Sequence, residues 1–253
     1  MSLQKVVDHA SQLESVNKLL FVFSSGSSNY GLYQEGVSDR DYTAFFLPSL
    51  EQVVLGGVQR PRQVKVSAEV EYELVDVRNL LSRFNKANFA SLDFLWAKER
   101  YVHDDAKALF KWLSENGYSL MKERSARLLK SHQASFKRQV LDPYLRGSVN
   151  TKKLSQQYYF LMLSSLLLDT KRQKRFYDFA KHANRWHETL GLSFPLLQVK
   201  AGHMAEEGVD KVFNDLMTLS LKLQDRKDVP KDVSFEESKL AEQLKQEVLK
   251  LFF

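Results

Sequence analysis

The chain has 253 residues, of which 43% are hydrophobic and 27% are charged, and it contains no cysteine. This composition is typical of a globular protein with a hydrophobic core, and it excludes disulfide bonds and thiolate metal sites. The net charge of +6 favours polyanionic partners, although many basic proteins have none. The N-terminus lacks an apolar signal region, and the apolar run Tyr158–Leu168 is too short to cross a bilayer. We therefore expect a cytoplasmic protein with no membrane partner.

The first hundred residues alternate between helical and strand patterns. Apolar residues within Val6–Val16 recur at helical spacing, which predicts a helix. Short apolar runs at Lys18–Ser25 and Asp41–Pro48 predict two buried strands, the second ended by proline. In Gln63–Val77 apolar and polar residues alternate, which predicts one long strand with a polar face.

The remaining patterns are helical, and beyond about residue 103 no strand is predicted. The predicted helices are Val77–Lys86, Phe89–Lys98, Ala106–Glu115, Leu120–Leu141, Lys152–Leu168, Arg172–Leu190, Leu196–Ala205, Gly208–Gln224 and Glu236–Leu251. We expect an α+β protein with two domains, a sheet-containing domain of residues 1–103 and an all-helical domain of residues 104–253.

The stretch between the first two predicted strands carries residues suited to chemistry. Gly26 and Ser27 follow the first strand, where a glycine lets the backbone approach a phosphate and a serine adds a hydroxyl donor. Asp39 and Asp41 are one residue apart at the start of the second strand, so their carboxylates point to the same face. Two such carboxylates repel each other unless a cation lies between them, and oxygen ligands suit Mg²⁺ or Mn²⁺.

The polar face of Gln63–Val77 offers a third carboxylate from Glu69, Glu71 or Glu73. If that strand lies beside the strand of Asp41, one of these glutamates completes a cluster of three carboxylates. The alternative is that the acidic pair is only the solvated end of a strand.

These residues resemble a known signature. Gly-Ser, followed after eleven residues by Asp-x-Asp, resembles the motif of the DNA polymerase β-type nucleotidyltransferase superfamily. Within that superfamily, "GSSNYGLYQEGVSDRDY" (Gly26–Tyr42) resembles a segment of the YcgL-type predicted nucleotidyltransferases of bacteria and phages. Glu71–Trp96 and, more weakly, Leu196–Leu223 are similar to later segments of the same family.

The resemblance implies a nucleotidyltransferase-type mixed sheet with flanking helices, followed by a helical domain that binds the acceptor. It implies transfer of a nucleoside monophosphate from a nucleoside triphosphate (NTP) to a hydroxyl group, with RNA such as a tRNA 3′ end as the acceptor. Mg²⁺ or Mn²⁺ would be required. The implied catalytic and metal-binding residues are Asp39, Asp41 and Glu71, with Glu73 as the alternate third carboxylate, and the implied nucleotide-binding residues are Gly26, Ser27 and Tyr30.

Two other functions stay open, a protein nucleotidylyltransferase and an inactive nucleic-acid-binding module. Arg40 departs from the family pattern, which has an apolar residue between the two aspartates. Basic residues of the helical half predict either an RNA-binding groove or a solvated charged face: Lys122, Arg124, Arg127, Lys130, Lys152, Lys153 and the run Lys171–Arg175.

Overall fold

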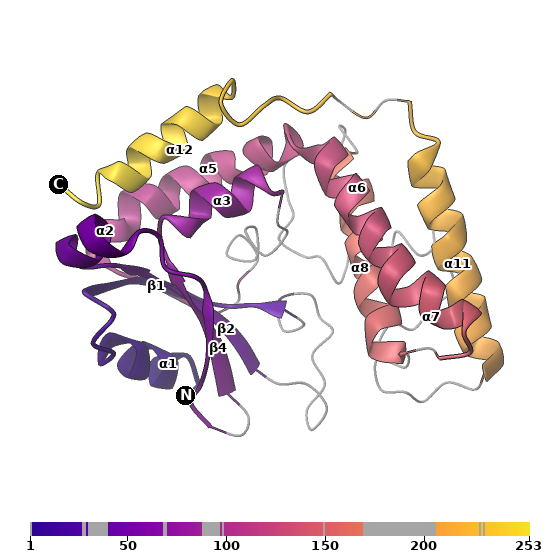
Figure 1. Cartoon of the computed structure of the whole chain (residues 1–253), viewed down its shortest axis with the longest axis horizontal. Helices are drawn as coiled ribbons and strands as arrows, with labels where there is room; N and C mark the ends of the chain where they lie inside the picture. The colour runs from indigo at the N-terminus through magenta and orange to yellow at the C-terminus, as the bar shows by residue number, and fades with distance from the viewer. Residues whose placement is uncertain are drawn as a thin grey trace. The chain divides into compact units, whose positions relative to one another are not determined.

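The computed structural model describes residues 2–26, 29, 40–67, 70–87, 97, 99–148, 150–168, 206–227, 229 and 231–253. The chain is an α+β protein with a five-stranded mixed sheet (Figure 1). It divides into two compact units, Met1–Glu123 with Val233–Phe253, and Arg124–Asp232. These units differ in extent from the predicted domains, because the first continues past residue 103 and includes the C-terminal segment.

The sheet has the strand order β3-β4-β2-β1-β5. In its centre β2 (Arg40–Leu47) pairs antiparallel with β1 (Lys18–Ser24) and parallel with β4 (Val70–Asp76). The edge strands β3 (Arg62–Lys65) and β5 (Arg100–Val102) pair antiparallel with β4 and β1. The strands predicted from the first two apolar runs are therefore confirmed.

The prediction of one long strand over Gln63–Val77 was wrong, because β3 and β4 are two strands of a hairpin. The backbone N–H groups of Val66 and Ser67 both donate to the carbonyl of Val70, at 2.9 and 3.2 Å, which reverses the chain. The predicted alternation of faces nevertheless holds within β4, where Val70, Tyr72 and Leu74 are buried on one side.

Helices cover both faces of the sheet in the first unit (Figure 1). One face carries α1 (Ser2–Ser11), and the other carries α3 (Asn79–Asn85), α5 (Lys107–Lys122) and α12 (Lys239–Leu249). A short helix, α2 (Leu50–Gly56), and a 3-10 turn, Asp104–Ala106, also belong to this unit. The helices α1, α3, α5 and α12 confirm predicted helices with shifted ends, whereas α2 and β5 were not predicted. The predicted helix at Phe89–Lys98 lies almost wholly outside the described residues.

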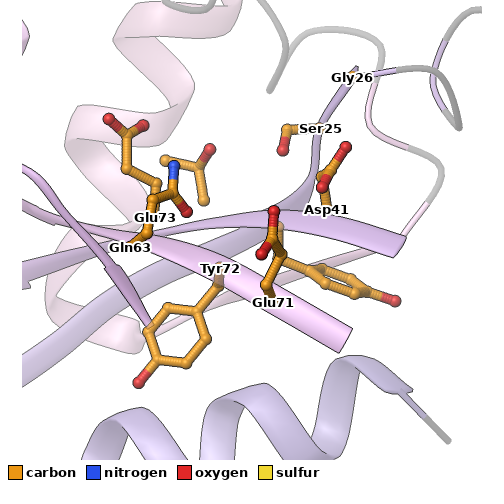
Figure 2. Close-up of a pocket in the computed structure, with 9 residues that line it drawn as sticks. Ser25, Gly26, Asp41, Gln63, Glu71, Tyr72 and Glu73 are labelled. Atoms are coloured by element: carbon orange, nitrogen blue, oxygen red, sulfur yellow. The ribbon is translucent and has the colours of Figure 1, made fainter. Parts of the chain in front are cut away.

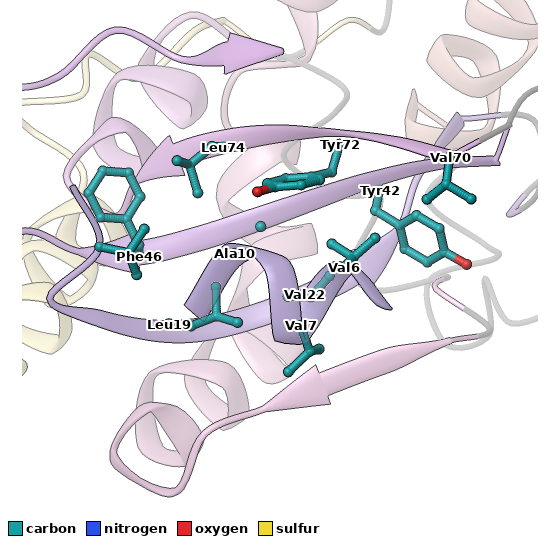
Figure 3. Packing of buried hydrophobic residues seen from close by; sticks show 12 residues of the cluster. Val6, Val7, Ala10, Leu19, Val22, Tyr42, Phe46, Val70, Tyr72 and Leu74 are labelled. Carbon is teal, nitrogen blue, oxygen red and sulfur yellow. The ribbon is translucent and has the colours of Figure 1, made fainter. Parts of the chain in front are cut away.

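The core between α1 and the sheet follows from the two periodicities of the sequence, together with a register shift between Leu19 and Phe21 in β1 that lets both Leu19 and Val22 join the core. Every second residue of a strand and every third or fourth residue of a helix faces the same side. The cluster contains Val6, Val7, Ala10, Val16, Leu19, Val22, Tyr42, Ala44, Phe46, Val70, Tyr72 and Leu74 (Figure 3). Burying large apolar side chains of this kind contributes about 1.5–3 kcal/mol each, so the cluster holds β2 and β4 in place.

The described part of the second unit consists of helices joined by turns and contains no strand. It contains α6 (Ser125–Phe136), a π-helical turn (Lys137–Leu141), α7 (Asp142–Leu145), α8 (Thr151–Leu168) and α11 (Glu206–Gln224). The prediction of one helix over Leu120–Leu141 was wrong, because α5 ends at Lys122 and α6 begins at Ser125. The predicted helices Arg172–Leu190 and Leu196–Ala205 lie outside the described residues. Among the helices that the structure describes, none has the length and apolarity needed to span a membrane.

His132 is a buried titratable group in the second unit. Its Nδ1 lies 2.5 Å from Oγ of Ser164, and its ring stacks on Phe160 with the centroids 5.1 Å apart. Burial lowers the pKa of His132 from its usual 6.5 to about 4. The unfolded chain therefore binds a proton more readily than the folded chain, and stability that is complete above about pH 6.5 falls as the pH drops towards 4.

We expect acid to lower the free energy of unfolding through this residue by ~3 kcal/mol once the pH is below the folded pKa. His132→Phe removes the titrating group, so the variant should lose this part of the pH dependence. Urea unfolding of both proteins at a series of pH values between neutrality and the folded pKa measures the effect. Identical pH dependence in the two proteins would contradict the assignment to His132.

Candidate functional site

Two carboxylates of neighbouring strands meet at one place on the sheet. In the parallel pairing of β2 with β4, Asp41 lies directly opposite Glu71. Residues in register on adjacent strands point to the same face, with their Cβ atoms about 5 Å apart. Figure 2 shows both carboxylates on the side of the sheet away from the Tyr72 ring. The adjacency on which the predicted carboxylate cluster depended is therefore present for Asp41 and Glu71.

These carboxylates line a pocket of about 270 Å³ on the sheet face opposite α1. The residues that line it are Ser25, Gly26, Asp41, Tyr42, Thr43, Gln63, Glu71, Tyr72 and Glu73. They come from the end of β1 and from strands β2, β3 and β4. Lys65 of β3 is the register partner of Glu71, so a cationic residue stands beside the acidic pair on the same face.

Gly26 lies against Asp41 because β1 ends beside the start of β2. The N–H of Ser25 donates to the carbonyl of Asp41 at 2.8 Å, which extends the ladder by one bond. Gly26 has a φ of 63°, a left-handed conformation that L-residues other than glycine rarely adopt. A Cβ at this position would lie 3.0 Å from Oδ2 of Asp41. The glycine thus supplies both the turn and the space for the carboxylate.

A buried hydrogen-bond network fixes this turn, and it was not predicted from the sequence. Asn29 is only 5% exposed and exchanges hydrogen bonds with Ser24, from Ser24 Oγ to Asn29 Oδ1 and from Asn29 Nδ2 to the Ser24 carbonyl. Its N–H donates to the carbonyl of Gly26 at 3.1 Å. Glu99 joins the network, because its carbonyl accepts from Ser24 N–H and its Oε2 accepts from Tyr42 Oη at 2.6 Å. The one feature of the sequence that indicates this role of Asn29 is its position three residues after a glycine, because asparagine side chains often hydrogen-bond to the backbone of turns.

The two glutamates of β4 have different surroundings. Oε2 of Glu73 accepts a 2.6 Å hydrogen bond from Nη2 of Arg83, whose side chain is only 8% exposed. Within the described residues Glu71 has no hydrogen bond or ion pair. Glu73 is therefore neutralised by a buried arginine, whereas Glu71 keeps its charge available to a ligand. The structure favours Glu71 over Glu73 as the third carboxylate.

Tyr72 belongs to the core rather than to the chemistry of the pocket. Its hydroxyl lies 2.9 Å from Nδ1 of His9 on the α1 side of the sheet. Burial raises the pKa of Tyr72 to about 12, against an opposing contribution from the positive charge of Arg62. The tyrosine stays protonated near neutral pH and is not a candidate general base.

The donors around Asp41 and Glu71 fit a hard divalent cation, because they are carboxylate, hydroxyl and backbone oxygens. Among the described residues no three His, Asp or Glu side chains gather in a group able to hold a metal ion. The predicted ligand Asp39, together with the predicted nucleotide-binding residues Ser27 and Tyr30, lies outside the described residues. Asp41 and Glu71 are thus the part of the predicted cluster that the structure brings together.

The predicted basic cluster does not lie on one continuous helical face. Lys122 ends α5 in the first unit, whereas Arg127 and Lys130 belong to α6 in the second. Arg124, between the two helices, is 1% exposed and faces the protein interior. Arg124 therefore belongs neither to a solvated charged face nor to an exposed RNA-binding groove, the two alternatives predicted for these basic residues.

Comparison of the chain with models of known protein families and with curated proteins gave no match in either case. The resemblance to nucleotidyltransferases therefore rests on the motif residues of the sequence.

Proposed function

We propose that the chain is a metal-dependent nucleotidyltransferase that transfers a nucleoside monophosphate from an NTP to a hydroxyl group, with RNA as the acceptor. The observation that carries this proposal is the register of the parallel β2–β4 pair, which sets Asp41 beside Glu71. The Gly26 turn lies against the same aspartate, so a glycine turn and two carboxylates share one pocket. A phosphate-binding turn beside an acidic pair is the arrangement that phosphoryl chemistry needs.

Each residue of the pocket has a role in this proposal. Asp41 and Glu71, with Asp39 of the same motif, would hold Mg²⁺ or Mn²⁺. When bound, the metal would neutralise phosphate charge and lower the pKa of the acceptor hydroxyl. The positive φ and missing side chain of Gly26 let its backbone approach the phosphates closely.

In this proposal Glu71 also acts on the hydroxyl group of the acceptor. Its carboxylate, which has no partner within the described part of the chain, accepts a hydrogen bond from the attacking hydroxyl, orients it and takes its proton as the oxygen attacks. The new bond joins that oxygen to the α-phosphorus, the bond from the α-phosphorus to the bridging oxygen breaks, and pyrophosphate leaves. Arg83 keeps Glu73 out of this step by pairing with it at 2.6 Å.

The proposal is tested by incubating the chain with NTPs labelled at the α-phosphate, Mg²⁺, and either total tRNA or total protein. We expect label in RNA, lost when EDTA is added. Label in protein instead would keep the chemistry and overturn the acceptor. Absence of label from both acceptors with every NTP and with Mg²⁺ or Mn²⁺ would overturn the transferase assignment.

A further inference from the structure

The pocket has a second row of polar residues beside the acidic one. Thr43, Glu73 and Gln63 lie opposite one another on β2, β4 and β3. This row is two residues along the strands from the row of Asp41 and Glu71, which places the rows about 7 Å apart. All three residues line the pocket, and Figure 2 shows Gln63 with Glu73, apart from Asp41 and Glu71.

The second row is suited to neutral hydrogen-bonding groups rather than to a cation. The charge of Glu73 is already compensated by Arg83, whose Nη2 binds Oε2 and whose guanidinium lies 5.5 Å from the centroid of the Phe45 ring. A carboxylate has about four acceptor positions, so Glu73 can accept further hydrogen bonds while it stays paired. Its orientation is fixed by that pair, and its side chain is 27% exposed.

Gln63 completes the row with an amide that both donates and accepts. It is exposed, and the described residues give its side chain no hydrogen-bond partner. A fixed carboxylate next to a free amide matches a pair of adjacent hydroxyl groups, which donate to the carboxylate and accept from the amide. In dinucleotide-binding folds, an aspartate or glutamate carboxylate accepts a hydrogen bond from a ribose hydroxyl.

We propose that Glu73 and Gln63 bind the 2′,3′-hydroxyl pair of a ribose, so that the site distinguishes ribonucleotides from deoxyribonucleotides. This inference rests on the proposed function, since it places a sugar next to phosphates held at Asp41 and Glu71. The two rows are separated by a distance similar to that between a sugar and its phosphate. The ribose belongs either to the NTP or to the 3′ end of an RNA acceptor.

The test measures binding of the full chain, with Mg²⁺, to each common ribonucleoside triphosphate and to its 2′-deoxy counterpart. An RNA trinucleotide with an ordinary or a 2′-deoxy terminal ribose forms the second arm. Wild-type protein should prefer the ribose form by about tenfold in one arm, which identifies the source of the sugar. Gln63→Ala should lower this ratio towards one, whereas Gln12→Ala, at an exposed glutamine following α1, should leave it unchanged.

These binding measurements distinguish failure of the ribose site from failure of the transferase proposal. Triphosphate binding with no preference for ribose in either arm, or with a preference that Gln63→Ala retains, overturns the ribose site and leaves the transferase proposal standing. If wild-type protein with Mg²⁺ binds no triphosphate at all, both proposals fail. Isothermal titration supplies the affinities without depending on turnover.

Discussion

Replacing Asp41 by asparagine should lower nucleotide transfer by roughly a thousandfold or more, because the proposed reaction depends on a charge fixed in the pocket. Asparagine keeps the size of the side chain and removes only its charge. Asp41 lies at the centre of the site, since it is the register partner of Glu71 on the neighbouring strand and lies against Gly26. The labelled-NTP assay measures the loss, and thermal unfolding of the variant shows whether the fold is kept.

The matched control is Asp8→Asn, which removes an exposed carboxylate from α1 on the opposite face of the sheet. It changes the net charge by the same amount and should transfer nucleotide at the wild-type rate. Full activity in Asp41→Asn would show that the charge of this aspartate has no role in the reaction. Equal loss in both variants would attribute the effect to overall charge instead of to the site.

Gly26→Ala should lower transfer by about a hundredfold, because the added methyl group displaces the Asp41 carboxylate. The Cβ would lie 3.0 Å from Oδ2, closer than atoms of this kind normally approach, and the turn holding Gly26 is fixed by Asn29. The positive φ of 63° adds strain of about 1 kcal/mol. Transfer rates and the free energy of unfolding are measured on the same preparation.

The control variant Gly57→Ala introduces backbone strain without displacing the Asp41 carboxylate. Gly57 has a nearly identical φ of 62°, but a Cβ there would meet no atom within 4 Å. This variant should lose at least as much stability, because the ψ of −161° at Gly57 lies in a region that only glycine adopts readily, and it should keep its activity. If Gly26→Ala is as active as Gly57→Ala, the close approach of Gly26 to Asp41 has no part in the chemistry.

The candidate site was predictable where a local pattern specifies it. The glycine turn, the aspartate at a strand start and the polar face of β4 all follow from residue types and period-two alternation. The pairing of β2 with β4 did not follow, because register between distant strands is set by tertiary packing. That pairing depends on the hydrophobic face shared by Tyr42 and Tyr72, which α1 covers.

The structural features that were not predicted lie where the local sequence is compatible with more than one structure. The turn at Val66 and Ser67 interrupts an alternation that continues through it without a glycine or proline. Gly117 falls between two predicted helices, Ala106–Glu115 and Leu120–Leu141, yet it is buried inside the single helix α5. The choice between Glu71 and Glu73 depends on Arg83, a residue of the following helix whose position only the fold reveals.

The most direct test of the account is Mn²⁺ binding, measured by electron paramagnetic resonance on wild-type protein, Asp41→Asn, Glu71→Gln and the double variant. If both carboxylates hold one metal site, each single variant loses at least about tenfold in affinity. The double variant then binds only slightly more weakly than either, because the residues act as a unit. Wild-type affinity in Glu71→Gln would contradict the claim that the β2–β4 register builds a metal site.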